Sequence, residues 1–182
     1  MKKFELTSEF VTFLGKKLFR IKALVSFGDV KEGELGGFVE KEENLDQSGN
    51  AWVYGNARVY GNARVYGNAQ VYGNAWVYGD AQVYGNAQVY GNAQVYGNAQ
   101  VYGNAWVQNC RDYSATSCFG SENRTTTFFR TKDGGVGVRC GCFYGTLAEF
   151  REKVKERHGD SRTAKEYLML ADLMEFRLSK DE

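Results

Sequence analysis

Apolar and polar residues follow one another with a period of six along the middle of the chain. From residue 51 to residue 104 the order is Ala, a variable residue, Val, Tyr, Gly and Asn, and only Asp80 departs from it outside the variable position. This period does not fit an α-helix, which repeats about every 3.6 residues. Ala-x-Val instead places two apolar side chains on the same side of a short strand. Gly-Asn then supplies a tight corner, because both residues tolerate positive φ.

A strand and a corner of constant length, repeated, coil the chain into a solenoid with a narrow interior. The interior accepts Val and Ala, whereas Tyr and the variable residue face outward. If three units complete one coil of 18 residues, Val53, Val71, Val89 and Val107 stack in one interior column. The pattern therefore predicts a mainly-β fold, a single-stranded solenoid over residues 51–107.

The segments outside the repeat are predicted to cover the ends of the solenoid. An open end exposes unpaired strand edges, so repeat proteins carry atypical terminal units. Residues 1–50 are interpreted as an N-terminal β cap, in which "KLFRIKALV" (17–25) has the alternation of a strand and "GELGGFV" (33–39) forms an irregular first coil. Trp52 and Trp106 stand in the first and last repeats, where we expect them to seal the junctions with the caps.

Residues 108–182 are predicted to form a small α+β unit of ββαα type. "TTTFFRT", the turn "KDGG" and "VGVRCGC" together indicate a β-hairpin. Thr146 and Glu149 have the spacing of a capping box at a helix start, and "TAKEYLMLADLMEFRL" has apolar residues at helical spacing. The expected elements are strands at 125–131 and 136–142, a helix from the capping box to about residue 157, and a helix at 163–178.

Charge and composition exclude several classes of protein. The chain has 23 basic and 22 acidic residues, which gives no basic face of the kind that nucleic-acid-binding proteins use. No apolar stretch approaches the roughly 20 residues of a membrane-spanning helix, and the N-terminus lacks the apolar stretch of a signal peptide. We therefore expect a soluble protein of the host-cell cytoplasm that binds neither nucleic acid nor membranes. Its four cysteines are expected to be thiols in that reducing compartment.

The repeat and the segment before it resemble a known family. "FRIKALVSFGDVKEGELGGFVEKEENLDQSGNAWVYGNARVYGNA" (19–63) and the repeats that follow are similar to the YdcK-type β-solenoid family, over residues 19–107. The unit also resembles the hexapeptide repeat of left-handed β-helices, with a small residue two positions before an aliphatic one. These resemblances imply a left-handed triangular β-helix, and the first also implies a phage or prophage protein. They imply almost nothing about activity.

Enzymatic chemistry is expected to be absent. Hexapeptide-repeat proteins include acyltransferases, which use a histidine base, and γ-class carbonic anhydrases, which bind zinc through three histidines. His158 is the single histidine of the chain and lies outside the repeat, so an acyltransferase is kept only as an alternative. Cys140 and Cys142, with Cys110, Cys118 and His158, are weak candidate metal ligands, because structural zinc sites use paired knuckles. We expect no metal and no cofactor.

These observations favour an interaction protein without enzymatic activity. The solenoid is interpreted as a rigid spacer, and the C-terminal unit as the surface for a protein partner, with Arg139, Phe143 and Tyr144 as candidate contacts. Interference with a host or defence protein is an expectation from the phage resemblance alone. A homo-oligomer, if present, is expected to use the solenoid face that carries Arg58 and Trp76, because these residues interrupt the repeat. An alternative is a sugar- or nucleotide-binding module that uses the Tyr and Trp faces.

Overall fold

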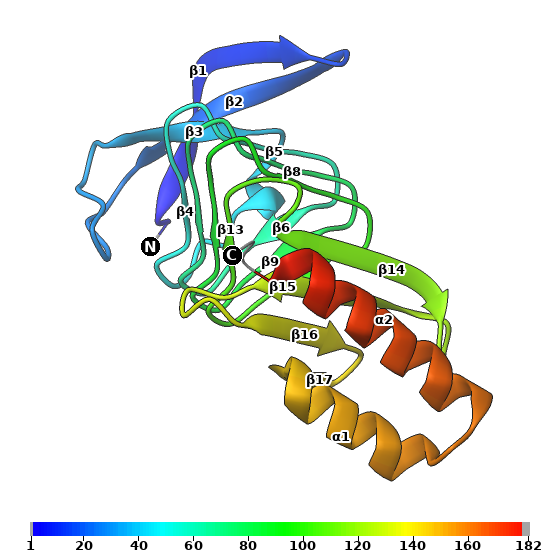
Figure 1. Ribbon diagram of the computed structural model, residues 1–182. Coiled ribbons are helices and arrows are strands. Elements are labelled where there is room, and N and C mark those ends of the chain that lie inside the picture. Colours follow the sequence, from blue (N-terminus) through cyan, green and yellow to red (C-terminus); the bar gives the residue numbers. More distant parts are fainter. Residues whose placement is uncertain (1, 180–182) are drawn as a thin grey trace.

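The repeat forms the middle of the molecule, between an N-terminal hairpin and a C-terminal α+β unit (Figure 1). The structure is a computed structural model that describes residues 2–179. Residue 1 and residues 180–182, at the ends of the two predicted terminal units, lie outside the described residues. None of the helices within the described part of the chain is long and apolar enough to span a lipid bilayer.

Ten two-residue strands form the solenoid, one in each repeat. Each of the first seven pairs in parallel with the strand three repeats further along, so that Val53 lies beside Val71, Val71 beside Val89, and Val89 beside Val107. Coils are therefore offset by 18 residues, and the strands fall into three sheets around the axis. This register confirms the three-sided solenoid and the predicted interior column. The strands are β4 (Trp52–Val53), β5 (Arg58–Val59), β6 (Arg64–Val65), β7 (Gln70–Val71), β8 (Trp76–Val77), β9 (Gln82–Val83), β10 (Gln88–Val89), β11 (Gln94–Val95), β12 (Gln100–Val101) and β13 (Trp106–Val107).

Small side chains fill the interior of the solenoid. Each repeat Val, and each Ala two positions before it, is at most 2 % exposed. The corner glycines have positive φ, 71° at Gly73, and a Cβ on Gly73 would lie 3.0 Å from the backbone nitrogen of Gly91 in the next coil. Glycine is therefore needed at this corner both for its backbone angle and for its missing side chain.

The outer faces of the solenoid carry ladders of stacked side chains. The rings of Tyr66 and Tyr84 stack with centroids 4.7 Å apart, and the other two faces carry equivalent stacks. The Tyr66 hydroxyl donates to Oε1 of Gln82 at 2.9 Å. At the corners, Nδ2 of Asn50 donates to Oδ1 of Asn68 at 3.2 Å. Because each ring covers a face of the next, the ladders stiffen the rod and present mainly ring edges to solvent.

Ionisation of these ladders is predicted to destabilise the protein in alkaline solution. Burial, and next the adjacent tyrosine, raises the pKa of Tyr60, Tyr72 and Tyr78. An unfolded chain loses its phenolic protons near pH 10, whereas the folded chain retains them, so the free energy of unfolding falls as the pH rises above about 10. Urea unfolding from about pH 8 to about pH 11 measures this fall.

Tyr78→Phe is the matched variant for that experiment, because it keeps a ring between Tyr60 and Tyr96 and removes one phenolic proton. We expect a shallower fall for the variant than for the wild type. Burial lowers the pKa of Lys3 to about 8, which makes stability rise with pH between 8 and 10.5, but this trend is common to both proteins and cancels in their difference. Identical slopes would contradict the role assigned to the ladder.

The N-terminal cap is a β-hairpin continued by a third strand. The three strands are antiparallel, and the third runs parallel to β5, so the hairpin extends one face of the solenoid. Trp52 is fully buried beneath this cap, with the rings of Phe27 and Phe4 edge-on at centroid distances of 5.4 and 6.2 Å. Trp52 therefore seals the junction as expected, whereas the first strand was not predicted. The elements are β1 (Phe4–Phe13), β2 (Lys16–Ala23), β3 (Leu35–Val39) and the 3-10 helix η1 (Glu42–Asn44).

The C-terminal unit has a four-stranded antiparallel sheet and two helices. The strand order is β14-β15-β16-β17, so the predicted hairpin gains one strand on each side, and the predicted ββαα unit is a ββββαα unit. The added strands, "YSATSCF" and "FYGT", contain Tyr, Phe and Thr but no Val or Ile, so only part of the residue types enriched in strands marks them. The capping box is confirmed, since the Glu149 backbone N–H donates to Oγ1 of Thr146 at 3.2 Å. The elements are β14 (Tyr113–Phe119), β15 (Arg124–Arg130), β16 (Val136–Cys140), β17 (Phe143–Thr146), α1 (Leu147–His158) and α2 (Arg162–Leu178).

The C-terminal sheet lies between the last coil of the solenoid and the two helices. On β15, Phe129 packs into the solenoid core, whereas Phe128 points to the other side and packs edge-on against Phe150 of α1, with ring centroids 5.9 Å apart. Oγ1 of Thr127 accepts a hydrogen bond from the Gln100 backbone N–H at 3.0 Å. The sheet therefore closes the end of the solenoid with one face and carries the helices on the other.

Candidate functional site

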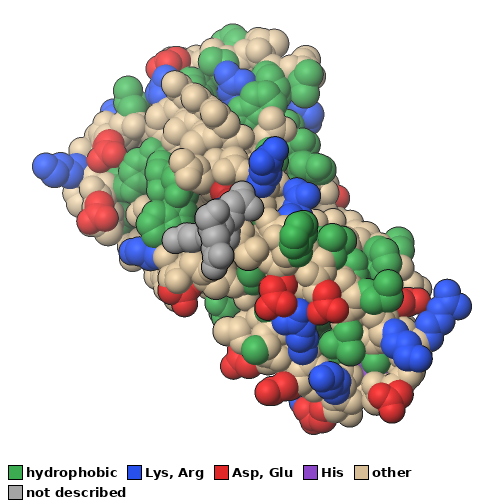
Figure 2. All heavy atoms as spheres, in the orientation of Figure 1, with side chains coloured by type: hydrophobic (Ala, Val, Ile, Leu, Met, Phe, Trp, Pro, Cys, Tyr) green, Lys and Arg blue, Asp and Glu red, His purple; other side chains and the backbone are tan. Residues whose placement is uncertain are grey.

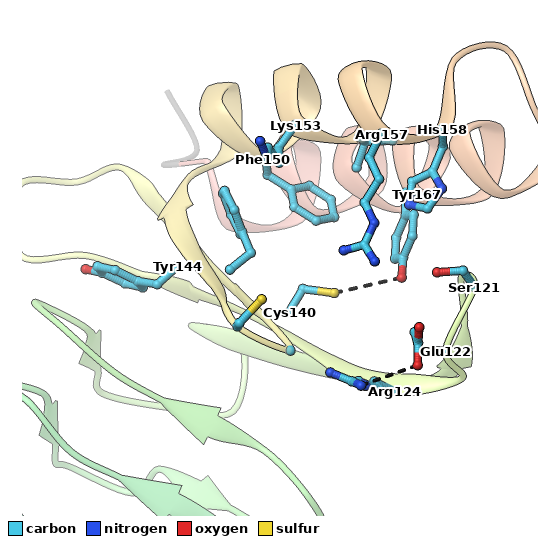
Figure 3. Close-up of a pocket in the computed structure, with 14 residues that line it drawn as sticks. Ser121, Glu122, Arg124, Cys140, Tyr144, Phe150, Lys153, Arg157, His158 and Tyr167 are labelled. Carbon is cyan, nitrogen blue, oxygen red and sulfur yellow. Dashed lines mark hydrogen bonds and ion pairs between the residues drawn. The ribbon is translucent and has the colours of Figure 1, made fainter.

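A pocket opens in the C-terminal unit, on the side of the sheet that faces the helices (Figure 3). It has a volume of about 570 Å³ and lies between α1, the start of α2, the turn after β14 and the turn that joins β16 to β17. Cys140 and Phe143 pair across the latter turn, so both side chains point to the same face of the sheet and line the pocket.

The floor of the pocket is apolar. The ring of Phe150, from α1, lies 5.6 Å from the ring of Phe143 and 5.6 Å from that of Tyr167, measured between centroids. Phe150 and Val154 are buried, because they lie four residues apart on α1 and face the sheet. Phe143 is only half-buried and offers apolar surface to a bound group.

Cys140 and Tyr167 form a polar wall of the pocket. The Thr126 hydroxyl donates to Sγ of Cys140 at 3.1 Å, and that thiol lies 3.9 Å from the hydroxyl oxygen of Tyr167, to which it donates. Burial, and next the neighbouring Cys140, raises the pKa of Tyr167 to about 12. The phenol is therefore neutral at pH 7 and keeps a proton that it can donate to a ligand.

Four basic side chains line the same pocket: Arg124, Lys153, Arg157 and His158. Two of them lie next to carboxylates, since Arg124 is 3.3 Å from Glu122 and Lys153 is 2.7 Å from Glu156. Arg157 forms no ion pair within residues 2–179, and Figure 3 shows its guanidinium extending from α1 into the pocket. The pocket therefore carries an excess of positive charge.

The three residues predicted to contact a partner do not form one surface. Arg139 and Tyr144 pair across the β16–β17 turn and face the solenoid, where Nε of Arg139 donates to Oε1 of Gln100 at 3.1 Å and Tyr144 lies edge-on to Tyr102 with ring centroids 4.5 Å apart. Phe143 points to the opposite side of the sheet and lines the pocket, at whose edge Tyr144 also lies. Arg139 thus helps to dock the C-terminal unit on the solenoid, whereas Tyr144 remains 41 % exposed.

The candidate metal ligands are spread over the C-terminal unit. Cys140, Cys142 and His158 line the pocket, Cys110 lines a separate pocket beside the solenoid, and Cys118 is exposed on β14. In the described part of the chain, no three His, Cys, Asp or Glu side chains gather in a way that could hold a metal ion.

The chain itself partly covers the face predicted for self-association. The ring of Phe13, at the end of β1, lies 4.7 Å from the ring of Trp76 and 4.8 Å from the guanidinium carbon of Arg58. That guanidinium carbon lies 5.7 Å from the Trp76 ring. The N-terminal hairpin thus packs on the two residues that interrupt the repeat, and self-association through them stays a prediction.

An apolar stripe on α2, which was not predicted from the sequence, is formed by Met169, Leu173 and Phe176. These side chains are 72, 54 and 83 % exposed, and their spacing of four and three residues places them on one side of the helix. Figure 2 shows exposed hydrophobic side chains in the region of α2 and β14. The opposite side of α2 buries Tyr167 and Met174 against the sheet. The signal was present in "YLMLADLMEF", which has more apolar residues than one buried face requires.

Comparison with known proteins supports the solenoid. The family model described as YdcK Beta solenoid repeat matches the chain four times, at residues 51–67, 57–79, 69–85 and 81–97. The repeat is similar to that family. No curated protein matches the chain. The matched residues all lie in the solenoid, so this similarity says nothing about the pocket or the apolar stripe.

Proposed function

We propose that the protein is a non-enzymatic interaction protein, in which a rigid solenoid presents a C-terminal unit that binds another protein. The observation that carries this proposal is the apolar stripe of α2. Single exposed apolar residues are common on protein surfaces, but three large ones on one side of a helix form a continuous patch. Such a patch is unfavourable in water and is typical of a surface that a partner covers.

The partner is a protein with an apolar groove and a rim that carries both signs of charge. Lys165 and Arg177 flank the apolar stripe and are exposed. Acidic residues lie on the same helix: Arg151 is 2.7 Å from Asp172 and 2.8 Å from Glu175, so one cation offsets only part of the charge of two carboxylates. The margin of the stripe therefore carries both signs of charge. A helix that places its apolar side in a groove is a common mode of recognition, and complementary charge around it selects the partner.

The solenoid suits a spacer better than it suits the alternatives. Its tyrosine rings cover one another, which disfavours a sugar or nucleotide stacked on the ladders. His158, which an acyltransferase would need, lies in the C-terminal unit with its ring 5.8 Å from that of Tyr167. Phage or prophage origin, a cytoplasmic location and interference with a host or defence protein are proposals that the resemblance of the repeat adds.

Site-specific cross-linking of the full chain tests this function. With the photoreactive amino acid p-benzoylphenylalanine in place of Phe176, we expect a specific protein of a host lysate to be captured. With the same group in place of Gln70, on the solenoid, we expect no capture. The captured protein, once purified, should bind the full chain directly, and Leu173→Asp should weaken that binding at least about tenfold, because it replaces an apolar contact by a charge.

Gln70→Asp is the control for that measurement, since it adds the same charge on an outer face of the solenoid and should leave binding unchanged. If Gln70→Asp abolishes binding and Leu173→Asp does not, the solenoid is the binding surface and the proposal is wrong.

A further inference from the structure

We propose that the pocket of the C-terminal unit binds a small organic anion, in which a flat apolar body carries an acidic group. The pocket joins three features that such a ligand requires: an apolar floor, the unpaired guanidinium of Arg157 and the free hydroxyl proton of Tyr167. The pocket is separate from the apolar stripe of α2. The inference therefore goes beyond the proposed function and does not depend on it.

The size and shape of the pocket favour a flat ligand. Its volume of about 570 Å³ lies within the usual range of small-molecule sites, about 300–1,000 Å³. The ring of Phe150 is inclined by 53° to that of Phe143 and by 88° to that of Tyr167. These rings do not stack face to face. Phe150 and Tyr167 are only 3 and 6 % exposed, whereas Phe143 is half-buried, so Phe143 offers the ring surface that an apolar group can contact.

The charges favour an anion. Among the described residues that line the pocket, Glu122 is the only carboxylate, and it lies next to Arg124. The last turn of α1 favours cations because of the helix dipole, and Lys155 meets that preference without lining the pocket. Arg157 belongs to the same turn and also lines the pocket, so its charge can meet a ligand there. A guanidinium can bind a carboxylate, sulfonate or phosphate through two parallel hydrogen bonds.

The hydroxyl of Tyr167 supplies a second, neutral donor. Because Cys140 donates to the oxygen of this hydroxyl, the Tyr167 proton is left to donate elsewhere. A Cβ on Gly120 would overlap the same hydroxyl, so the turn after β14 holds it in place. A donor fixed in this way loses little conformational entropy when a ligand binds.

Fluorescence titration with 8-anilinonaphthalene-1-sulfonate tests the inference. This probe joins flat aromatic rings to a sulfonate, and we expect saturable binding of one probe per chain. N-phenyl-1-naphthylamine, the same body without the sulfonate, should bind about tenfold more weakly, and Arg157→Gln should weaken binding of the sulfonate by a similar factor, because each change removes one charge-assisted hydrogen-bonding pair. Tyr167→Phe should weaken it less.

The natural cysteines locate the bound probe. Cys140 and Cys142 line the pocket, whereas Cys110 and Cys118 do not. Saturating probe should therefore slow the alkylation of Cys142 by iodoacetamide, measured by mass spectrometry, and leave the rate at Cys118 unchanged. Both of these cysteines are exposed, so each reports on the native protein.

Two further variants decide the result. Lys155→Gln removes a charge from the same turn of α1 outside the pocket, and Phe176→Ser alters the apolar stripe; both should bind the sulfonate as the wild type does. Arg157 and Lys155 are exposed, so neither substitution should unfold the chain. The inference is wrong if Arg157→Gln binds as tightly as the wild type, if the uncharged probe binds equally well, or if Phe176→Ser abolishes binding.

Discussion

Val89→Asp is expected to unfold the solenoid. Val89 has no exposed surface, and its neighbours in the interior column are Val71 and Val107. The interior consists of Val and Ala side chains, so the carboxylate would have no partner and no water. An unpaired buried charge costs about 3–5 kcal/mol, which is a large part of the roughly 5–15 kcal/mol that stabilises a typical domain. Urea unfolding followed by circular dichroism measures the loss.

The control for Val89→Asp is Gln70→Asp, which places the same residue on a two-residue strand with its side chain outside the solenoid. We expect it to cost less than about 1 kcal/mol, the range of strand propensities. The two variants lie on the paired strands β7 and β10 and differ in whether the charge is on the outer or the inner side of the sheet. Equal destabilisation would mean that the Val side chains do not form the core, and the assigned register would then be wrong.

The solenoid could be predicted from the sequence because every repeat has the same pattern of apolar, polar and corner residues. Val and Ala at alternate positions face the interior. Gly at the corner is needed for two reasons: its positive φ and the close approach of the next coil. Neighbouring coils have nearly the same sequence, so each residue pairs with the equivalent residue of the next coil. The pairing of strands that are distant in the sequence can therefore be predicted, which is unusual for a β fold.

The terminal units lack this redundancy. The patterns of β15, β16 and both helices are local and could be predicted. The strands β1, β14 and β17 could not, because their pairing depends on strands elsewhere. Both faces of β15 are buried, so its sequence does not alternate and does not show which side meets the solenoid. The orientation of the sheet places Arg139, on β16, at the junction with the solenoid and places its neighbour Cys140 in the pocket.

The pocket and the apolar stripe were missed for related reasons. The pocket forms where side chains from the β14–β15 turn, α1 and α2 meet, and no single segment contains its pattern. The ring of Phe143, a predicted partner contact, packs against Phe150 and lines the pocket, and a partner contact there stays a prediction. The apolar residues of α2 were interpreted as one core face, because a sequence does not show how many sides of a helix its neighbours cover.

Arg130→Met is expected to loosen the C-terminal unit from the solenoid. Asp112, in the segment between them, is 4 % exposed, and Nη1 of Arg130 lies 3.2 Å from its Oδ1. Arg130 also donates to the backbone oxygens of Leu178 and Ser179, both at 2.9 Å, and so ties the end of α2 to the same point. Removing the guanidinium leaves a buried carboxylate and two carbonyl groups without that partner.

We expect Arg130→Met to cost about 3 kcal/mol, the lower part of the range for breaking a buried pair, because the Arg130 side chain is 30 % exposed and Met preserves the apolar stem. Hydrogen exchange should rise at residues 108–112 and in the last turn of α2, and remain slow in the central coils, since repeat units are stabilised mainly by their neighbours. Arg124→Met is the matched control, because the Arg124–Glu122 pair is 58 and 54 % exposed and should contribute less than about 1 kcal/mol. Equal costs for the two variants, or faster exchange throughout the solenoid, would show that Asp112 and Arg130 do not hold the junction.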